Sequence, residues 1–172
     1  MSVFGWIIIL QHLGSYDWDL PWADYKAGFG SPDYHNFWLG LEKMHLLTSS
    51  QPYRLRVEME MYFSGEWYSA EYWSFKIGDE LNDKYRLDVS WYSGDAGNAL
   101  QHAGKEHDGM KFTTLDQDND IHGSTNCAQG RYGGWWFNRC TKACLTCASS
   151  KHVWETIAEE RVINSRMMIK AQ

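Results

Sequence analysis

The stretch from residue 116 to residue 140 combines alternating acidic residues, two cysteines and a Trp-Trp step. It reads D-Q-D-N-D-I-H-G-S-T-N-C-A-Q-G-R-Y-G-G-W-W-F-N-R-C. The carboxylates of Asp116, Asp118 and Asp120 repel one another unless a cation or a set of N–H donors lies among them. Oxygen ligands at this spacing suit Ca²⁺ better than zinc or copper, although a solvated acidic turn has a similar composition. The pattern does not favour an EF-hand, whose loop needs glycine where Ile121 stands and a Glu further on.

The composition indicates a folded domain. Hydrophobic residues make up 44% of the 172 residues, with 10 Trp and 10 Tyr, which excludes disorder and predicts one domain over residues 1–172. The net charge of −6 argues against a nucleic-acid partner. No apolar run approaches the roughly 20 residues of a membrane span, so we expect no membrane insertion. The run from Val3 to Leu10 lacks the basic flank and cleavage site of a signal peptide and favours a strand.

All four cysteines (Cys127, Cys140, Cys144 and Cys147) lie in one short stretch. Their spacing does not match the paired C-x-x-C motifs of a zinc ribbon. Clustered cysteines beside a calcium-type loop indicate an oxidising environment, so we expect a secreted protein in its mature form behind an initiator Met. Cys144 and Cys147 either pair with each other or link the chain to a second one. A redox role lacks the usual context of a helix after a strand.

Hydrophobic periodicity predicts an α+β fold with an antiparallel sheet. Alternating apolar residues indicate strands at Trp6–Gln11, Tyr53–Tyr62, Trp67–Ile77, Tyr85–Tyr92 and Val162–Lys170, the last closing the sheet. A helix is expected to start near Asp19, with Pro21 in its first turn and Gly28 near its end, and a second over Leu41–Leu47. The segment from Ser93 to Asn126 lacks periodicity, and a loop of that length is usually functional or ordered by an ion.

Several ordered motifs resemble the fibrinogen C-terminal-like domain, which is found in ficolins, tachylectins, tenascins and angiopoietins. They are W-A-D-Y-K-A-G-F-G, F-W-L-G-L-E-K-M-H-L-L-T, Y-R-L-R-V-E-M, D-K-Y-R-L-D-V-S-W-Y-S-G-D-A-G-N-A-L, D-G-M-K-F-T-T-L-D-Q-D-N-D, N-C-A and G-G-W-W-F-N-R-C. Together they run from about Gly5 to Cys140. The resemblance implies a twisted antiparallel sheet with short helices and a loop-rich, calcium-binding C-terminal subdomain. The family's N-terminal subdomain is missing from residues 1–172, and the C-terminal pocket region is shortened.

By this resemblance, Asp118 and Asp120 are expected to bind calcium through their side chains, and His122 and Ser124 through their main-chain carbonyls. One residue is inserted between Asp120 and Cys127 relative to the family pattern. The resemblance also implies a disulfide between Cys127 and Cys140 and a cis peptide bond before Cys140.

The chain departs from the acetyl-binding members of the family around the second cysteine. Thr141 replaces the usual His, C-L-T-C replaces N-L-N-G, and an aromatic loop that walls the acetyl pocket is missing. Arg131 stands where acetyl-binding members carry Tyr, four positions after the first cysteine. A pocket beside the calcium loop must therefore be built from other residues.

Arg131 and Arg139 flank the Gly-Gly-Trp-Trp step, and guanidinium groups match carboxylates. Tyr132 has an aromatic face for a pyranose or an acetamido methyl group. We therefore expect a lectin for N-acylated glycans, most of all sialic acid, similar to the short sialic-acid-binding lectins of slugs and snails. The alternative is that both arginines are solvated surface charges. The predicted ligand-binding set is Gln129, Arg131, Tyr132, Gly133, Arg139, Cys140 and Thr141. Trp135 and Trp136 are expected in the core.

Other functions remain open or are disfavoured. A protein- or peptide-binding module is the main alternative, because Gln129 also occurs in a peptide-binding member, although Gly130 and Thr141 count against it. An enzyme is not expected, since no nucleophile–base pair is evident and His102, His107 and His122 are more simply solvated or hydrogen-bonded. Weak binding per site predicts a homo-oligomer, a dimer or larger, that gains avidity from several sites.

Overall fold

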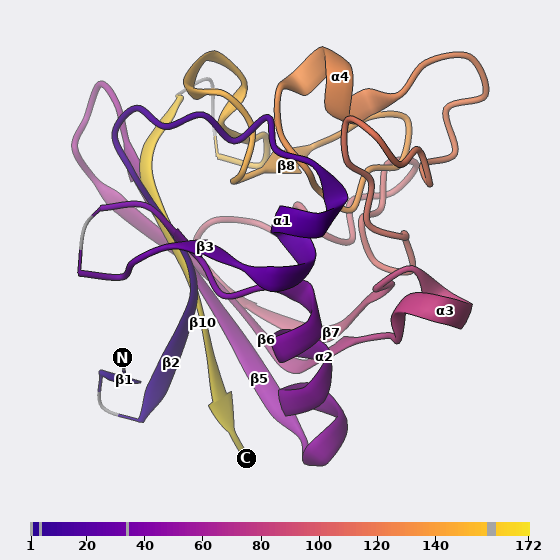
Figure 1. The fold of residues 1–172 in the computed structure, drawn as a ribbon. Helices are drawn as coiled ribbons and strands as arrows, with labels where there is room; N and C mark the ends of the chain where they lie inside the picture. Colours follow the sequence, from indigo (N-terminus) through magenta and orange to yellow (C-terminus); the bar gives the residue numbers. More distant parts are fainter. Residues whose placement is uncertain (1, 4, 34, 158–160) are drawn as a thin grey trace.

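An antiparallel sheet forms the centre of the computed structural model, which describes residues 2–3, 5–33, 35–157 and 161–172. The strands lie in the order β3-β4-β2-β10-β5-β6-β7, and β1 pairs with β2. Figure 1 shows the sheet twisted behind the helices α1 and α2. This arrangement confirms the predicted α+β class. The strand bounds are β1 (Ser2–Val3), β2 (Trp6–Leu13), β3 (Phe29–Gly30), β4 (Phe37–Trp38), β5 (Tyr53–Met61), β6 (Trp67–Ile77), β7 (Leu87–Gly94) and β10 (Val162–Ala171).

Strand β5 confirms the alternation predicted for it. Its buried and half-buried residues alternate along the whole strand. The side chains on the inner face, from Tyr53 to Met61, are all at most 5% exposed. The intervening arginines and glutamates lie on the opposite face of the sheet, since successive side chains of a strand point to opposite faces.

The C-terminal strand β10 lies inside the sheet, between β2 and β5, and not at an edge. It pairs antiparallel with both neighbours, with Met167 opposite Leu10 on β2 and Val57 on β5. The last strand of the chain therefore joins the N-terminal strand to the central hairpin.

The strand predicted from Tyr85 begins two residues later, at Leu87. Lys84 and Tyr85 have φ values of 49° and 54°, a left-handed conformation that cannot continue a strand. They follow the short helix α3 (Glu80–Asp83), which was not predicted. Asp79 caps this helix by accepting a hydrogen bond from the main-chain N–H of Asn82 at 2.8 Å.

The two predicted helices are present with shifted ends. Helix α1 (Trp22–Ala27) begins after Pro21, which is the residue before the first turn and not within it. Helix α2 extends to Ser50 (Leu41–Ser50) and buries Leu41, Met44 and Thr48. Gly28 is required after α1, because a Cβ there would lie 2.3 Å from the main-chain oxygen of Leu39.

An aromatic cluster links the helices to the C-terminal region. The ring of Phe112 lies 5.0 Å from Trp136 and 5.8 Å from Trp38, measured between centroids. Tyr25 on α1 packs against Phe112 at 5.2 Å. The core therefore continues from the sheet into a region with little regular secondary structure.

That region contains the long loop expected before Cys127. Residues 95–126, all of them described, contain no helix or strand beyond isolated bridges such as Thr113 with Trp135. It is followed by α4 (Cys127–Arg131), η1 (Ser149–Lys151) and a small sheet of β8 (Ala143–Cys144) and β9 (Val153–Trp154). Figure 1 shows α4 and these loops packed at one end of the large sheet.

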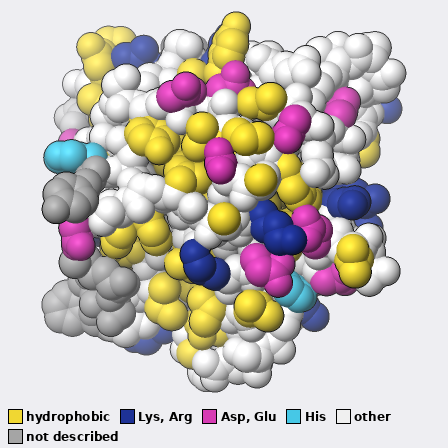
Figure 2. Space-filling model, viewed as in Figure 1, with side chains coloured by type: hydrophobic (Ala, Val, Ile, Leu, Met, Phe, Trp, Pro, Cys, Tyr) yellow, Lys and Arg dark blue, Asp and Glu magenta, His cyan; other side chains and the backbone are white. Residues whose placement is uncertain are grey.

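Acidic, basic and histidine side chains gather near α1, α2 and α3 on the side seen in Figure 2. Lys26, Glu42, His45 and Glu80 line a shallow depression there. Lys26 and Glu80 form an ion pair at 2.5 Å, so opposite charges are paired on this side. None of the described helices has the length and apolar character needed to cross a bilayer.

Candidate functional site

The acidic loop is held by hydrogen bonds from the main chain. Asp116 accepts bonds from the N–H of Trp22 at 2.9 Å and from the hydroxyl of Thr114 at 2.7 Å. Trp22 is the first residue of α1, so Asp116 supplies a hydrogen-bond acceptor to an otherwise unpaired N–H at the helix start. The first of the three alternating carboxylates thus joins the loop to the core.

Asp118 and Asp120 lie closer to the cysteine segment. Asp118 is exposed and accepts a bond from the N–H of Asp120 at 3.3 Å. The half-buried Asp120 accepts bonds from the N–H groups of His122 at 2.7 Å and Cys127 at 2.8 Å. Burial raises the pKa of the Asp120 carboxyl, and the charge of Asp118 raises it further. A cation beside the pair would relieve this repulsion.

The helix α4 connects the acidic loop to the disulfide. Asn126 caps it by accepting a bond from the N–H of Ala128 at 2.8 Å, and its amide donates to the carbonyl of Thr114 at 2.9 Å. Cys127, the first residue of α4, is bonded to Cys140, and the Arg139–Cys140 peptide is cis. Both features were expected from the family resemblance and are confirmed.

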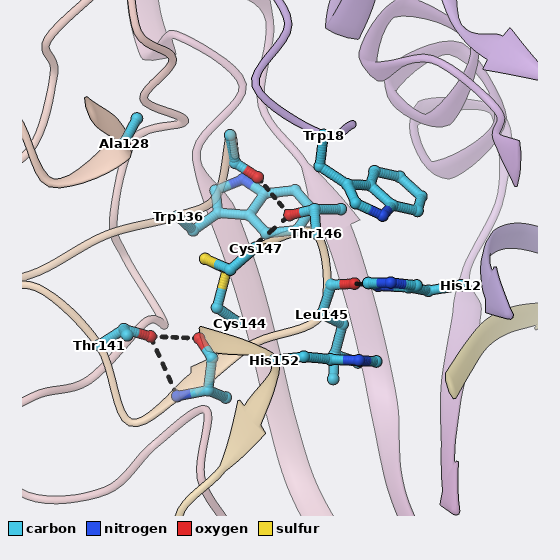
Figure 3. The surroundings of a disulfide bond; sticks show 12 residues. His12, Trp18, Ala128, Trp136, Thr141, Cys144, Leu145, Thr146, Cys147 and His152 are labelled. Carbon is cyan, nitrogen blue, oxygen red and sulfur yellow. Dashed lines mark hydrogen bonds between the residues drawn. A yellow bond between two sulfur atoms is a disulfide. The ribbon is translucent and has the colours of Figure 1, made fainter. Parts of the chain in front are cut away.

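Cys144 and Cys147 form a second disulfide, so they pair with each other and not with a second chain. Residues 143–147 are all fully buried, and no cysteine in the chain is free. Residues 144–147 form a turn, the C-L-T-C turn, closed by this disulfide. Figure 3 shows the turn between Trp136 on one side and His12 and His152 on the other. The hydroxyl of Thr146 donates to the carbonyl of Gly134, and the imidazole of His12 donates to the carbonyl of Leu145 at 2.9 Å.

The Gly-Gly-Trp-Trp step lies beneath this turn. A Cβ at Gly133 would lie 1.9 Å from the main-chain oxygen of Thr146. Gly134 donates its N–H to the hydroxyl of Tyr25 at 2.9 Å. Trp135 and Trp136 are both 0% exposed, as predicted, and the indole of Trp136 donates to the carbonyl of Tyr85 at 2.7 Å. This step is part of the core.

His107 is a buried anchor for the segment after Cys140. Its Nδ1 donates to the carbonyl of Trp136 at 2.7 Å, and its Nε2 accepts bonds from the N–H groups of Lys142 and Ala143, each at 3.2 Å. This pattern requires the neutral imidazole with the proton on Nδ1. Burial lowers the pKa of His107 to about 4. His107 was expected to be solvated or hydrogen-bonded, and it is hydrogen-bonded.

The predicted ligand-binding residues separate into exposed and buried groups. Gln129, Tyr132 and Arg139 are exposed, and Arg131 and Cys140 are half-buried. Gln129 donates its amide to the carbonyl of Leu115 at 3.0 Å. Thr141, in contrast, is 1% exposed, and its hydroxyl donates to the carbonyl of Ala143. A ligand could contact the Thr141 side chain or the buried Gly133 only by displacing the C-L-T-C turn or its neighbours.

The match to known families covers almost the whole chain. Residues 2–162 match the family model described as "Fibrinogen beta and gamma chains, C-terminal globular domain". The chain is 38% identical to protein scabrous of Drosophila melanogaster, and the match covers 96% of this chain and 20% of that protein. It is 43% identical to human fibroleukin, with 82% of this chain and 32% of that protein covered. Across the curated relatives it matches, the chain spans between 17% and 47% of their length.

Solved structures share the fold. The fibrinogen-like globe domain of human ANGPTL2 superposes with a TM-score of 0.87 at 34% identity, over 97% of this chain and 80% of that one. A lamprey fibrin D-dimer, complexed with the peptide Gly-His-Arg-Pro-amide, superposes with a TM-score of 0.85 at 32% identity. The superposition covers 95% of this chain and 60% of the lamprey chain. The chain therefore belongs to the fibrinogen C-terminal domain family, whose members are binding modules and not enzymes.

Proposed function

We propose that this chain forms one extracellular binding domain whose ligand surface lies beside the Cys127–Cys140 disulfide. Its proposed ligand is an acidic, N-acylated glycan, with terminal sialic acid as the first candidate. The two intrachain disulfides support an oxidising, extracellular location. The side chains proposed to meet the ligand are those at the surface, namely Gln129, Arg131, Tyr132 and Arg139.

The observation that carries this proposal is that two arginine side chains lack an interaction partner. Arg131 and Arg139 have no side-chain hydrogen bond, ion pair or ring contact with any described residue. Every other arginine has one: Arg56 and Arg166 pair with Glu58, Arg86 with Asp83, Arg54 lies over Trp6 and Trp73, and Arg161 over Tyr62. Unpaired guanidinium groups four residues after Cys127 and directly before Cys140 favour a ligand with a carboxylate.

Tyr132, the residue after Arg131, adds an exposed aromatic side chain. Its side chain is 55% exposed, although the residue is held in place as the cap of α4 with φ at 55°. Its N–H donates to the carbonyl of Ala128 at 2.8 Å. An exposed ring on this fixed main chain can pack on the apolar face of a sugar or on an acetamido methyl group.

The first prediction concerns the two guanidinium groups. We expect Arg131→Gln and Arg139→Gln each to weaken sialoside binding at least about tenfold, because each removes a charge-assisted hydrogen bond worth roughly 1.5–3 kcal/mol. Titration with N-acetylneuraminic acid measures the change, and haemagglutination inhibited by that sugar but not by mannose provides a second test. Arg86→Gln, a surface arginine paired with Asp83, is the matched control. A glycan array without any sialylated or N-acetylated hit would overturn the proposal.

A peptide ligand is the second candidate. The lamprey fibrin D-dimer, which shares the fold at 32% identity, is complexed with Gly-His-Arg-Pro-amide. Capture of the chain by an immobilised peptide with this basic N-terminus, together with a silent glycan array, would favour the peptide. The free arginines argue for the glycan, because they repel a basic peptide.

We further propose that calcium orders the loop before Cys127. The donor set fits, since Asp118 is an exposed carboxylate, Asp120 keeps lone pairs beyond its two main-chain bonds, and nearby carbonyls at His122 and Ser124 are oxygen ligands. Among the described residues no group of three or more His, Cys, Asp or Glu side chains forms a metal cluster. The site therefore depends on main-chain carbonyls and water in addition to two carboxylates.

The second prediction concerns this loop. Calcium at about 100 times its Kd is expected to raise the free energy of unfolding by about 2.7 kcal/mol, because it binds the folded loop and not the unfolded chain. Thermal unfolding in calcium and in EGTA measures the effect. Asp118→Asn should abolish it, whereas Asp33→Asn, at another exposed aspartate, should retain it. Equal unfolding temperatures with and without calcium would contradict the proposed site.

Avidity is proposed to come from non-covalent assembly. All four cysteines are paired within the chain, so none remains for a disulfide to another chain. We propose a homo-oligomer, a dimer or larger, in which several weak sites act together.

A further inference from the structure

A hollow of about 480 Å³ lies on the face of the sheet opposite α1 and α2. It is formed where β10, β5 and β6 run side by side, next to the residue that follows β7. Its lining includes Arg56, Glu58, Trp67, Ser69, Asp95 and Arg166. None of these residues belongs to the acidic loop or to the segment around the Cys127–Cys140 disulfide.

The register of the sheet brings these residues together. Glu58 on β5 stands opposite Ser69 on β6 and opposite Arg166 on β10. All three side chains point away from the core, because the residue that follows each of them along its strand is buried. Glu58 lies at the bottom of the hollow, with its side chain only 15% exposed.

An ion-pair network holds the floor of the hollow. Glu58 accepts bonds from Arg56 at 2.7 Å and from Arg166 at 2.5 Å, and Arg56 also donates to Glu71 at 2.5 Å. Burial raises the pKa of the Glu58 carboxyl, but the bonds from the two arginines outweigh it and hold the pKa below its ordinary value. The polar groups are therefore fixed before any ligand arrives.

Trp67 forms an aromatic wall beside this network. Its side chain is 49% exposed, and the guanidinium of Arg166 lies 5.9 Å from the ring centroid. A half-exposed indole that is held by a neighbouring arginine offers a rigid apolar surface, which suits the C–H face of a pyranose ring.

Asp95 provides a hydrogen-bond acceptor on the other side. One carboxylate oxygen accepts bonds from the N–H of Ser69 at 2.6 Å and from its hydroxyl at 3.4 Å. The second oxygen has no partner among the described residues. It is free to accept a bond from a ligand hydroxyl.

The charges of the hollow cancel, which limits the kind of ligand. Its lining contains the guanidinium groups of Arg56 and Arg166 and the carboxylates of Glu58 and Asp95. A charged ligand would disturb these pairs, whereas hydroxyl groups can donate to a carboxylate and accept from a guanidinium. We propose that this hollow is a second ligand site, which binds a neutral saccharide by stacking on Trp67 and by hydrogen bonds to Asp95 and the two arginines.

The test uses the full chain and four neutral disaccharides: maltose, cellobiose, lactose and N,N′-diacetylchitobiose. Each is titrated while the indole N–H signals are followed by NMR, and the Trp67 signal is assigned from Trp67→Phe. At least one disaccharide is expected to shift that signal with a Kd on the order of 1 mM. Trp67→Ala should weaken binding at least tenfold, and Trp67→Phe, which keeps an aromatic ring, should weaken it less.

Two control variants show whether the sugar binds at this hollow. Trp91→Ala removes an indole that is 73% exposed and does not line the hollow, so it should leave the affinity unchanged. With maltose, cellobiose and lactose, which carry no N-acyl group, the double variant Arg131→Gln/Arg139→Gln should also bind as the parent chain does, because the two sites share no residue. The proposal is wrong if no disaccharide shifts the Trp67 signal at about 50 mM, some fifty times the expected Kd, or if Trp67→Ala and Trp91→Ala have the same effect.

Discussion

Replacing Gly133 by alanine is expected to lower the free energy of unfolding by about 3 kcal/mol, because the new methyl group has no space. A Cβ at this position would lie 1.9 Å from the main-chain oxygen of Thr146 and 2.8 Å from its carbonyl carbon. Main-chain atoms cannot move aside as the end of a flexible side chain can. The turn is also closed by the Cys144–Cys147 disulfide and by the bond from Thr146 to Gly134.

Gly130→Ala is the matched control for this substitution. Gly130 lies in α4 and is exposed, and a Cβ there would meet no atom within 4 Å beyond the backbone of its own helix. Alanine there should change stability by less than about 1 kcal/mol, in the stabilising direction, since it favours a helix more than glycine does. Urea unfolding followed by tryptophan fluorescence compares the two variants with both disulfides intact. Equal stabilities would mean that the turn over Gly133 is not closed as the structure shows.

Gly133 also illustrates what the sequence leaves undetermined. Its place beside Arg131 and Tyr132 predicted a surface residue that meets the ligand. It is buried because Thr146, thirteen residues later, folds back over it. Thr141 is buried for a similar reason, since its neighbours Lys142 and Ala143 bind His107 from the distant loop. No local sequence pattern predicts these contacts between residues that are far apart in the chain.

Features with a local signal were predicted better. The strands β5 and β6 and the burial of Trp135 and Trp136 follow from alternation and hydrophobicity, and they are confirmed. The helix α4 and the two-residue strands are too short to produce a recognisable hydrophobic periodicity in the sequence. The hollow beside Trp67 was missed because it depends on register. Glu58 and Arg56 appear in the sequence only as the polar half of an alternating strand, and pairing with β6 and β10 is what brings them to Trp67 and Arg166.

Acidification from pH 7 toward pH 4 is expected to destabilise the folded chain strongly. Three histidines are buried and uncharged, namely His12, His107 and His152, each at most 1% exposed. Burial lowers the pKa of all three below the ordinary value near 6.5, and that of His107 to about 4. Above pH 6.5 these residues are neutral in both the folded and the unfolded chain. Below it the unfolded chain binds protons that the folded chain does not, so the free energy of unfolding falls as the pH falls.

His107 alone accounts for a loss of about 3 kcal/mol between pH 6.5 and pH 4, at about 1.4 kcal/mol per pH unit. Its charged form would point an N–H from Nε2 at the N–H donors of Lys142 and Ala143, which now bind that nitrogen. The nearby carboxylates of Glu155 and Glu106 favour the charged form but do not overcome burial.

His12 and His152 add to this loss in the same direction. Their rings are stacked 4.1 Å apart at an angle of 4°, so a charge on either ring disfavours a charge on the other. Arg161 also lowers the pKa of His152. Both rings hold parts of the structure that are far apart in the chain, because His12 binds Leu145 at 2.9 Å and His152 contacts Ser165 at 2.9 Å.

Urea unfolding at several pH values between 7.5 and 5 tests this prediction, above the range in which most carboxylates titrate. His107→Asn should be less stable at pH 7, yet its plot of free energy against pH should be flatter by about 1.4 kcal/mol per unit below pH 6.5. His102→Asn, at an exposed position, is the matched control. If the parent chain keeps the same stability from pH 7.5 to 5, the buried histidines do not make the fold acid-sensitive. If both variants show the same slope, His107 is not a source of the acid sensitivity.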